Sequence, residues 1–146
     1  MRFSVKEIGL YERDVKFRLP FRYGVVTLTQ APQAFVRATI ETEKGVRGTG
    51  GAAEMLAPKW FDKDRTLTNE QNFDQLRNSL FMARDSYLAA EPNTAFGHSI
   101  DIYGPQIAIG AVTGLNSLVA CYGPALIDRA VLDALCRALE IGRAHV

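Results

Sequence analysis

The chain has 146 residues, of which 47% are hydrophobic and 23% are charged, and this length and composition suit one soluble globular domain with a buried core. Seventeen basic residues nearly balance sixteen acidic ones, which gives a formal net charge of +1. This balance, without any run of like charge, provides no electrostatic footprint for nucleic acid and disfavours partners that select on bulk charge.

The sequence lacks the usual signals for secretion or for membrane insertion. Residues Met1 to Lys6 have no apolar signal-peptide core. The longest weakly polar stretch, Ile107 to Tyr122, is interrupted by Asn116 and two glycines and falls short of the roughly twenty residues that span a bilayer. Cys121 and Cys136 lie in apolar surroundings outside any CxxC motif. We therefore expect a cytoplasmic protein, with no membrane partner and with reduced, buried thiols rather than a disulfide.

Alternating apolar residues predict strands in the first third of the chain. The first strand lies between Phe3 and Phe17, and its alternation slips near Gly9 as a β-bulge would make it. The second covers Ala34 to Glu41, with apolar side chains on one face. A turn at Glu43 to Gly45 returns the chain into a short third strand, at 46–50. The pattern predicts a three-stranded antiparallel meander.

A glycine-rich stretch closes the meander. Gly48, Gly50 and Gly51 could cradle a phosphate, but no Lys-Ser/Thr pair follows them and no clear helix begins beside them. We interpret them as strand positions at which the backbone approaches a neighbour closely.

Three helices are predicted after the meander. Thr68 to Gln71 fits a capping box, and apolar residues at helical spacing then predict a helix from about Asn69 to Ala90. Residues Thr94 to Pro105 have the composition of a connecting loop. A second helix, from about Gln106 to Tyr122, is apolar nearly all round, and a third runs from Ala125 to about Leu139. Both carry more apolar surface than we expect this chain to cover.

The element order and several motifs together resemble the N-terminal capping domain of the enolase superfamily, in its mandelate racemase and muconate lactonizing enzyme branch. The motifs are Pro20-Phe21-Arg22-Tyr23-Gly24 and Thr27-Leu28-Thr29 before the second strand, the hairpin from Thr42 to Gly50, and Ala130 to Leu135 in the last helix. The resemblance implies an α+β fold, in which a three-stranded antiparallel meander is followed by a helical bundle.

The resemblance also implies how the chain is divided. Residues 1–123 correspond to the capping domain, with the meander at 1–53 and the helices at 69–122. The last helix, 124–139, leads toward a (β/α)₈ barrel, a unit that needs about 250 residues. Residues 140–146 resemble the in-frame translation of a sequencing adapter, although Arg143 and His145 would also suit a natural helix end.

Members of this family abstract a proton α to a carboxylate and stabilise the resulting enediolate on Mg²⁺. The metal ligands and the acid/base residues lie on the barrel, so we assign no catalytic and no metal-binding residue here. The resemblance implies that Mg²⁺ is a cofactor of a longer parent enzyme only. That parent is expected to be a homo-oligomeric racemase or epimerase, dehydratase or cycloisomerase that acts on a small-molecule carboxylate, and the fragment alone is expected to be inactive.

The titratable residues of the chain do not assemble into a site by spacing. Glu54, Asp101, Asp128 and Asp133 are scattered, and we interpret them as solvated or capping groups. His98 is interpreted as a surface or loop histidine, because no Ser or Cys stands beside it in a recognisable motif. A stand-alone enzyme that uses His98 with Asp101 therefore has little support.

The chain can still contribute substrate specificity. In similar proteins two irregular, mobile segments close over the barrel mouth, and they match Phe21 to Thr29 and Glu54 to Phe61 here. The candidate substrate-binding residues on these segments are Phe21, Arg22, Tyr23, Thr27, Thr29, Met55, Lys59 and Trp60. Arg22 or Lys59 would pair with a distal anion of the substrate, while the aromatic residues and Met55 would exclude water. Alternatively, the aromatic side chains only pack under the hairpin.

A competing hypothesis comes from a different functional class. The chain could be a complete, non-enzymatic α+β module that binds a protein partner through the apolar surfaces of its second and third predicted helices.

Overall fold

A computed structural model of the chain describes residues 1–24 and 26–142, so most of the adapter-like tail, at 143–146, lies outside the described residues. Three strands, β1 (Phe3–Tyr23), β2 (Val26–Thr42) and β3 (Arg47–Met55), form an antiparallel sheet in the order β1-β2-β3. The helices are α1 (Asn69–Ala89), α2 (Ala95–Val112), α3 (Ser117–Ala120) and α4 (Tyr122–Ala138). The predicted α+β fold, a meander followed by helices, is confirmed.

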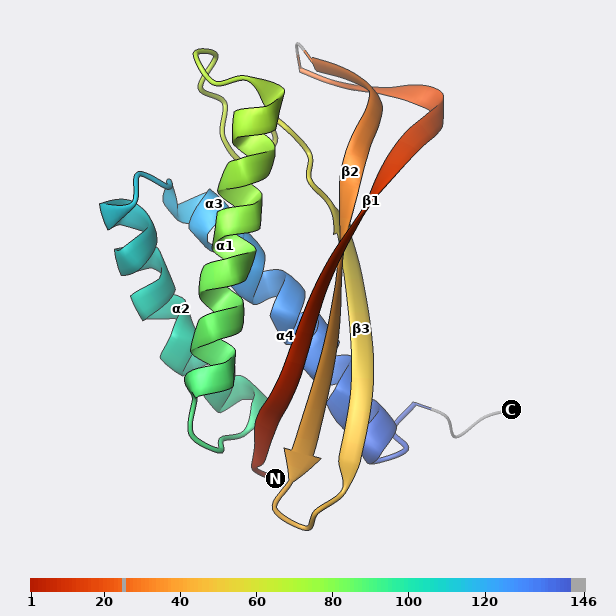
Figure 1. Ribbon diagram of the computed structural model, residues 1–146, viewed down its shortest axis with the longest axis vertical. Coiled ribbons are helices and arrows are strands. Elements are labelled where there is room, and N and C mark those ends of the chain that lie inside the picture. Colours follow the sequence, from red (N-terminus) through yellow and green to blue (C-terminus); the bar gives the residue numbers. More distant parts are fainter. Residues whose placement is uncertain (25, 143–146) are drawn as a thin grey trace.

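The helices cover one face of the sheet in two layers (Figure 1). α1 and α4 pack against the strands, while α2 packs mainly on α1, α3 and α4. The core between the sheet and the helices contains large side chains that are almost fully buried: Phe3, Ile40, Leu76, Tyr87, Leu126 and Ile127. Burial of each such side chain contributes about 1.5–3 kcal/mol, so this interface is the main source of stability.

β1 and β2 continue beyond β3 as a two-stranded ribbon. The ladder is interrupted between Lys16 and Phe21 and then resumes, so that Tyr23 pairs with Val26 at the tip. The expectation of a strand that ends at Phe17, followed by an irregular segment, was therefore wrong. Pro20 has no amide to donate, but it lies in the interruption of the ladder, where a strand tolerates proline.

The β2–β3 turn forms as predicted. Gly45 has a φ of 77°, and its amide donates a hydrogen bond to the carbonyl oxygen of Thr42, at 2.8 Å. The predicted bulge is displaced, because the register shift lies between Val5 and Glu7 and not at Gly9. Gly9 instead leaves room for an aromatic ring, since a Cβ atom there would lie 2.7 Å from the hydroxyl oxygen of Tyr11.

The close backbone approach predicted for the glycine-rich stretch is confirmed where β3 meets α4. A Cβ atom on Gly48 would lie 2.2 Å from the carbonyl oxygen of Ala134, and one on Gly50 would lie 2.1 Å from its amide nitrogen. A Cβ atom on Gly51 would meet only the carbonyl oxygen of Val36, at 3.5 Å. Gly48 and Gly50 therefore allow α4 to pack directly on the strand.

The capping box of α1 is confirmed in both directions. The amide of Gln71 donates to Thr68 Oγ1 at 3.2 Å, and the amide of Thr68 donates to Gln71 Oε1 at 2.7 Å. Two otherwise unpaired amides at the helix start are satisfied in this way.

The loop predicted from Thr94 to Pro105 is helical, so that prediction was wrong. Thr94 Oγ1 accepts a hydrogen bond from the amide of Gly97, at 3.0 Å, and caps α2. Pro105 lies inside α2 at an exposed position, where water can satisfy the carbonyl group that proline leaves unpaired. The predicted single helix at 106–122 is also divided, because Gly114, with a φ of 80°, turns the chain before α3.

The apolar surfaces of the later helices are covered unequally. Leu126, Ile127, Ala130 and Ala134 of α4 are buried, so α4 is covered more fully than predicted, while its Leu132 remains 48% exposed. α2 does leave large apolar side chains exposed, and the residues concerned are Phe96, Ile100, Tyr103, Ile109 and Val112.

Two further expectations concern the compartment and the thiols. None of the helices in the described part of the chain is long and apolar enough to cross a bilayer. Cys121 and Cys136 are free thiols, but they are half-buried instead of fully buried as predicted.

Candidate functional site

The tip of the β1–β2 ribbon lies at one end of the molecule (Figure 1). A cleft is formed there between the tip and the start of α1. Its volume is about 830 Å³, and its lining residues are Tyr23, Gly24, Val26, Lys59, Trp60, Lys63, Arg65 and Asn69. They come from the ribbon tip, from the first turn of α1, and from residues 56–68, which we call the lid loop. The two segments singled out in the sequence thus meet at one cleft.

An aromatic contact joins the ribbon tip to the lid loop. The Tyr23 hydroxyl donates a hydrogen bond to the carbonyl oxygen of Pro58, and the Tyr23 and Trp60 rings pack edge to face with their centroids 5.2 Å apart. Burial raises the pKa of Tyr23, which keeps the hydroxyl protonated and able to donate. Trp60 remains 52% exposed, so part of its ring is available to a ligand.

Lys59 is engaged with the backbone of its own loop. Its φ of 61° lies in the left-handed region, and its amide donates to Asn72 Oδ1 at 3.2 Å. Its Nζ donates to the carbonyl oxygen of Asp64, at 2.6 Å, and to that of Leu67. Two of its three N–H donors are therefore used to hold the loop closed.

The lid loop is also fixed to the helices. Asp62 Oδ2 accepts from Gln75 Nε2 at 3.1 Å, and Asn116 Nδ2 donates to the carbonyl oxygen of Phe61 at 3.3 Å. Hydrogen bonds from the Thr66 hydroxyl and amide lower the pKa of Asp64. These contacts determine where the loop places the side chains that line the cleft.

The charged residues in the lining are all basic. They are Lys59, Lys63 and Arg65, and no carboxylate is among the described lining residues. Lys63, Arg65 and Asn69 were not predicted as site residues. The sequence does contain two cations, in Lys63-Asp64-Arg65, shortly after the predicted segment ends at Phe61. Only the folded loop shows that they line the cleft.

The other predicted site residues lie outside the cleft lining. Arg22 pairs with Thr27, next to the pair formed by Tyr23 and Val26. Because successive side chains of a strand point to opposite faces, Arg22, Thr27 and Thr29 point away from the face of the ribbon that carries Tyr23. Phe21 shares the face of Tyr23, with ring centroids 5.5 Å apart, and is 53% exposed. Met55 is half-buried at the end of β3.

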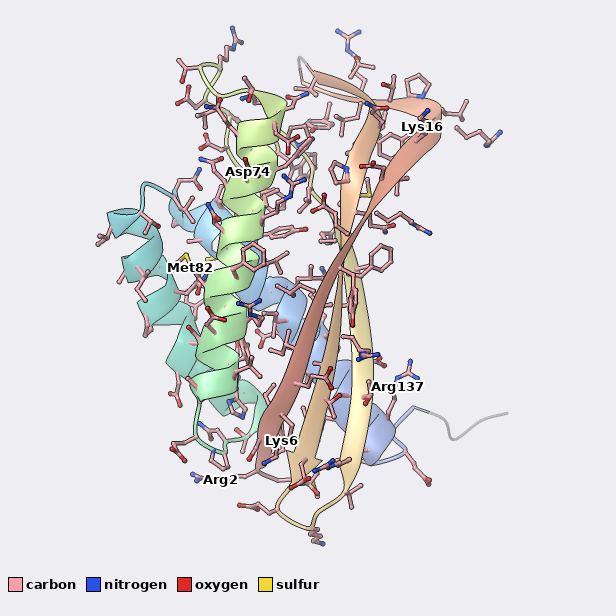
Figure 2. The ribbon with its side chains drawn as sticks, viewed as in Figure 1. Arg2, Lys6, Lys16, Asp74, Met82 and Arg137 are labelled. Atoms are coloured by element: carbon pink, nitrogen blue, oxygen red, sulfur yellow. The ribbon has the colours of Figure 1, made fainter. Side chains whose placement is uncertain are left out.

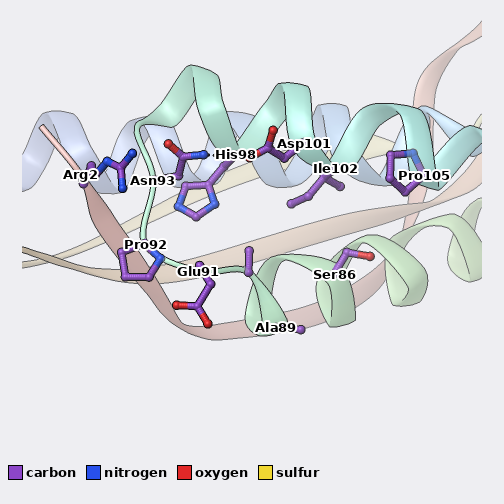
Figure 3. Close-up of a pocket in the computed structure, with 11 residues that line it drawn as sticks. Arg2, Ser86, Ala89, Glu91, Pro92, Asn93, His98, Asp101, Ile102 and Pro105 are labelled. Carbon is purple, nitrogen blue, oxygen red and sulfur yellow. Dashed lines mark hydrogen bonds between the residues drawn. The ribbon is translucent and has the colours of Figure 1, made fainter.

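His98 is not a surface or loop residue, and that prediction was wrong. It is 1% exposed, because the cap at Thr94 starts a helix that turns the imidazole into the core, where Nε2 lies 3.1 Å from the carbonyl oxygen of Phe3. His98 and Asp101 both line a cavity of about 450 Å³ (Figure 3). The Asp101 carboxylate, however, accepts a hydrogen bond from Asn93 Nδ2, at 2.8 Å.

The remaining acidic residues serve separate structural contacts. Glu54 pairs with Arg129 at 3.1 Å, Asp128 accepts from the hydroxyls of Tyr87 and Ser99, and Asp133 accepts from the amide of Gly51 at 2.8 Å. Among residues 1–24 and 26–142, no three His, Cys, Asp or Glu side chains are grouped so that they could hold a metal ion.

No sequence-family model matches the chain, and no curated protein matches it significantly in sequence. Solved structures do match it in fold. An enolase from the alpha proteobacterium BAL199 with bound magnesium is 18% identical, with a TM-score of 0.58 over 94% of this chain and 32% of that chain. A Bradyrhizobium enolase complexed with magnesium and mandelic acid is 16% identical, with a TM-score of 0.55 over 96% of this chain and 33% of that one.

A mandelate racemase/muconate lactonizing protein from Herpetosiphon aurantiacus is 16% identical, with a TM-score of 0.51 over 93% of this chain and 32% of that chain. The fold is that of the enolase N-terminal domain. The resemblance inferred from the sequence motifs is thereby confirmed for the fold. The chain spans about a third of the length of these solved chains, so its enolase N-terminal fold corresponds to one part of each.

Proposed function

We propose that the chain is the substrate-capping domain of a Mg²⁺-dependent enolase-superfamily enzyme that abstracts a proton α to a carboxylate. The observation that carries this proposal is the cleft in which the ribbon tip and the lid loop meet. The fold supports it, because a Bradyrhizobium enolase of the same N-terminal fold is complexed with magnesium and mandelic acid.

The chain's own residues contribute binding and orientation in this proposal. Tyr23 and Trp60 exclude water from one end of the substrate, and the cations of the lid loop hold its polar groups. The described residues do not provide a magnesium site, so the metal ligands and the base belong to a barrel. The fragment alone is then inactive.

The proposal includes the division of the chain. Residues 1–123 form the capping domain, and the helix at 124–139 leads into the barrel. The whole enzyme is a cytoplasmic homo-oligomer that acts as a racemase or epimerase, dehydratase or cycloisomerase.

The coding sequence beyond residue 139 tests this proposal. We expect several hundred further residues, with three acidic ligands at strand ends and a Lys or His base. The extended protein should exchange the α-proton of its carboxylate substrate with D₂O in a Mg²⁺-dependent manner, as followed by NMR. A natural stop codon close to residue 146 at the source locus would overturn the proposal.

A second function is favoured by one observation, the exposed apolar side chains of α2. Phe96 is 76% exposed and Val112 is 89% exposed, which suits a protein-binding surface. A complete module of this kind should be a well-behaved monomer or dimer in light scattering. A fragment should instead bind hydrophobic dyes and aggregate in the same preparation.

A further inference from the structure

The lid loop carries two cations whose side chains form neither a hydrogen bond nor a salt bridge with the described residues. Lys63 and Arg65 both line the cleft and are exposed, and neither forms a salt bridge within the part of the chain that the structure describes. Lys59, the third cation in the lining, is instead engaged with the carbonyl oxygens of its own loop. Lys63 and Arg65 are thus available to a ligand.

We infer that Lys63 and Arg65 form a binding site for a compact oxyanion, a carboxylate or a phosphate, attached to an apolar body that packs on Trp60. One part of this inference rests on the proposed function, namely that the anion is the end of the substrate remote from the reacting carbon. The anion site itself does not depend on it. Such a substrate would carry two anionic groups, one held here and one at the metal.

The acidic residues of the lid loop form no salt bridge with this pair among the described residues. Asp62 accepts hydrogen bonds from the amide of Asp64, at 2.9 Å, and from Gln75 Nε2, at 3.1 Å. Asp64 Oδ1 accepts from the amide and the hydroxyl of Thr66, at 2.8 and 2.7 Å. Both carboxylates thus accept hydrogen bonds from groups other than Lys63 and Arg65, and neither lines the cleft. An anion entering the cleft meets a lining in which every charge is positive, which favours its binding over that of neutral molecules.

Lys59 gives this pair a defined position. Its Nζ contacts the carbonyl oxygens of Asp64 and Leu67, which lie on either side of Arg65 in the sequence. The backbone that carries Lys63 and Arg65 is therefore held in place before a ligand arrives, which reduces the conformational entropy lost on binding. The guanidinium of Arg65 can offer two parallel donors to one oxyanion, while Lys63 adds a point charge.

The aromatic rings of Tyr23 and Trp60 supply the apolar half of the site. Trp60 packs edge to face with Tyr23 and is about half exposed, so it offers a fixed surface to a ring or hydrocarbon body. The cleft volume of about 830 Å³ is in the range of small-molecule sites. The side chains thus suit one small anion and not a polymer.

Trp60 is the only tryptophan in the sequence, so its fluorescence reports directly on the cleft. We would titrate the whole chain with benzoate, phenyl phosphate and benzyl alcohol, which share a ring and differ in charge. The expected result is a saturable change with one or both anions and a much weaker one with the neutral alcohol. The two anions distinguish a carboxylate site from a phosphate site.

Variants assign the effect to individual residues. Lys63→Gln and Arg65→Gln should each weaken anion binding roughly tenfold, as expected for loss of one charged hydrogen-bonding partner. Matched controls are Lys44→Gln, in the β2–β3 turn, and Arg2→Gln; the turn and Arg2 lie at the opposite end of the molecule from the cleft (Figure 2). The controls should retain the original affinity. Far-UV circular dichroism verifies that each variant is folded.

The outcomes separate this inference from the proposed function. Absence of a saturable change, unaltered affinity in both cleft variants, or equal weakening in the controls would overturn the anion site, whatever follows residue 139. Anion binding that depends on Lys63 and Arg65 would support the site even if no barrel is encoded downstream. In that case only the capping proposal fails.

Discussion

The Tyr23 hydroxyl donates a hydrogen bond to the carbonyl oxygen of Pro58, which is 35 residues away in the sequence. This contact joins the last residue of β1 to the lid loop, and the edge-to-face packing of Tyr23 on Trp60 lies beside it. The ribbon tip extends beyond β3, so β3 does not pair with it. The shape of the cleft therefore depends on Tyr23.

Replacement of Tyr23 by phenylalanine tests this dependence. Tyr23→Phe keeps the ring but leaves the Pro58 carbonyl without its donor, so we expect a loss of about 0.5–1.5 kcal/mol in the free energy of unfolding. Greater mobility of the tip should also shift Trp60 emission to longer wavelength. Urea denaturation followed by fluorescence measures both quantities. Tyr11→Phe, which changes an exposed ring elsewhere on β1, is the control; equal effects of the two variants would contradict the prediction.

The features that the sequence predicted correctly depend on local contacts. The capping box needs only Thr68 and Gln71, three residues apart, and the β2–β3 turn needs a glycine at position 45. The signal for Gly48 and Gly50 was also local, because several glycines in one strand indicate a close neighbour. Such local patterns can be recognised in the sequence without knowledge of the tertiary structure.

The features that were missed depend on distant contacts. Pro105 and the neighbouring glycines are typical of a loop, yet the segment is a helix that begins at the Thr94 cap and packs its buried His98 against Phe3, 95 residues away in the sequence. The position of Lys63 in the cleft lining could not be predicted either, since it follows from carbonyl contacts of Lys59 in a folded loop. The two faces of the ribbon tip could not be assigned before its register was known.

A pair of adjacent glycines tests the packing of β3 on α4. Gly50→Ala would place a Cβ atom 2.1 Å from the backbone nitrogen of Ala134, which cannot move without shifting the helix. We expect a loss of about 1–3 kcal/mol or more in stability, as for other overpacked positions. Gly51→Ala is the matched control, because its nearest neighbour would be 3.5 Å away. Chemical denaturation curves for the two variants should differ clearly, and coincident midpoints would contradict the model of close packing.

Removal of the buried imidazole distinguishes a structural role from a catalytic one. His98→Ala should lower the free energy of unfolding by about 2–4 kcal/mol, because it leaves a cavity and removes one of the two hydrogen bonds to the Phe3 carbonyl, which keeps only the bond from the amide of Asn93. Asp101→Asn, at the exposed side of the same helix, should change stability by less than about 1 kcal/mol. Thermal unfolding measures both. A His98 variant as stable as the original chain would contradict the structural role.

Alkaline pH should destabilise the fold through its buried tyrosines. Burial, reinforced by the hydrogen bond to Asp128, raises the pKa of Tyr87, and burial likewise raises the pKa of Tyr122. In the unfolded chain a tyrosine loses its proton near pH 10, whereas the folded state retains it to higher pH. The stability from these groups is therefore complete below pH 10 and is lost as the pH rises above it.

Each such tyrosine should contribute a slope of about 1.4 kcal/mol per pH unit above pH 10, until its folded pKa is reached. Urea midpoints measured from pH 8 to 11.5 give the total slope. Tyr87→Phe should make the slope shallower by one proton, although it also lowers stability at pH 8 through loss of the Asp128 contact. If Tyr87→Phe and the original chain lose stability in parallel above pH 10, the Tyr87 hydroxyl does not titrate as its burial requires.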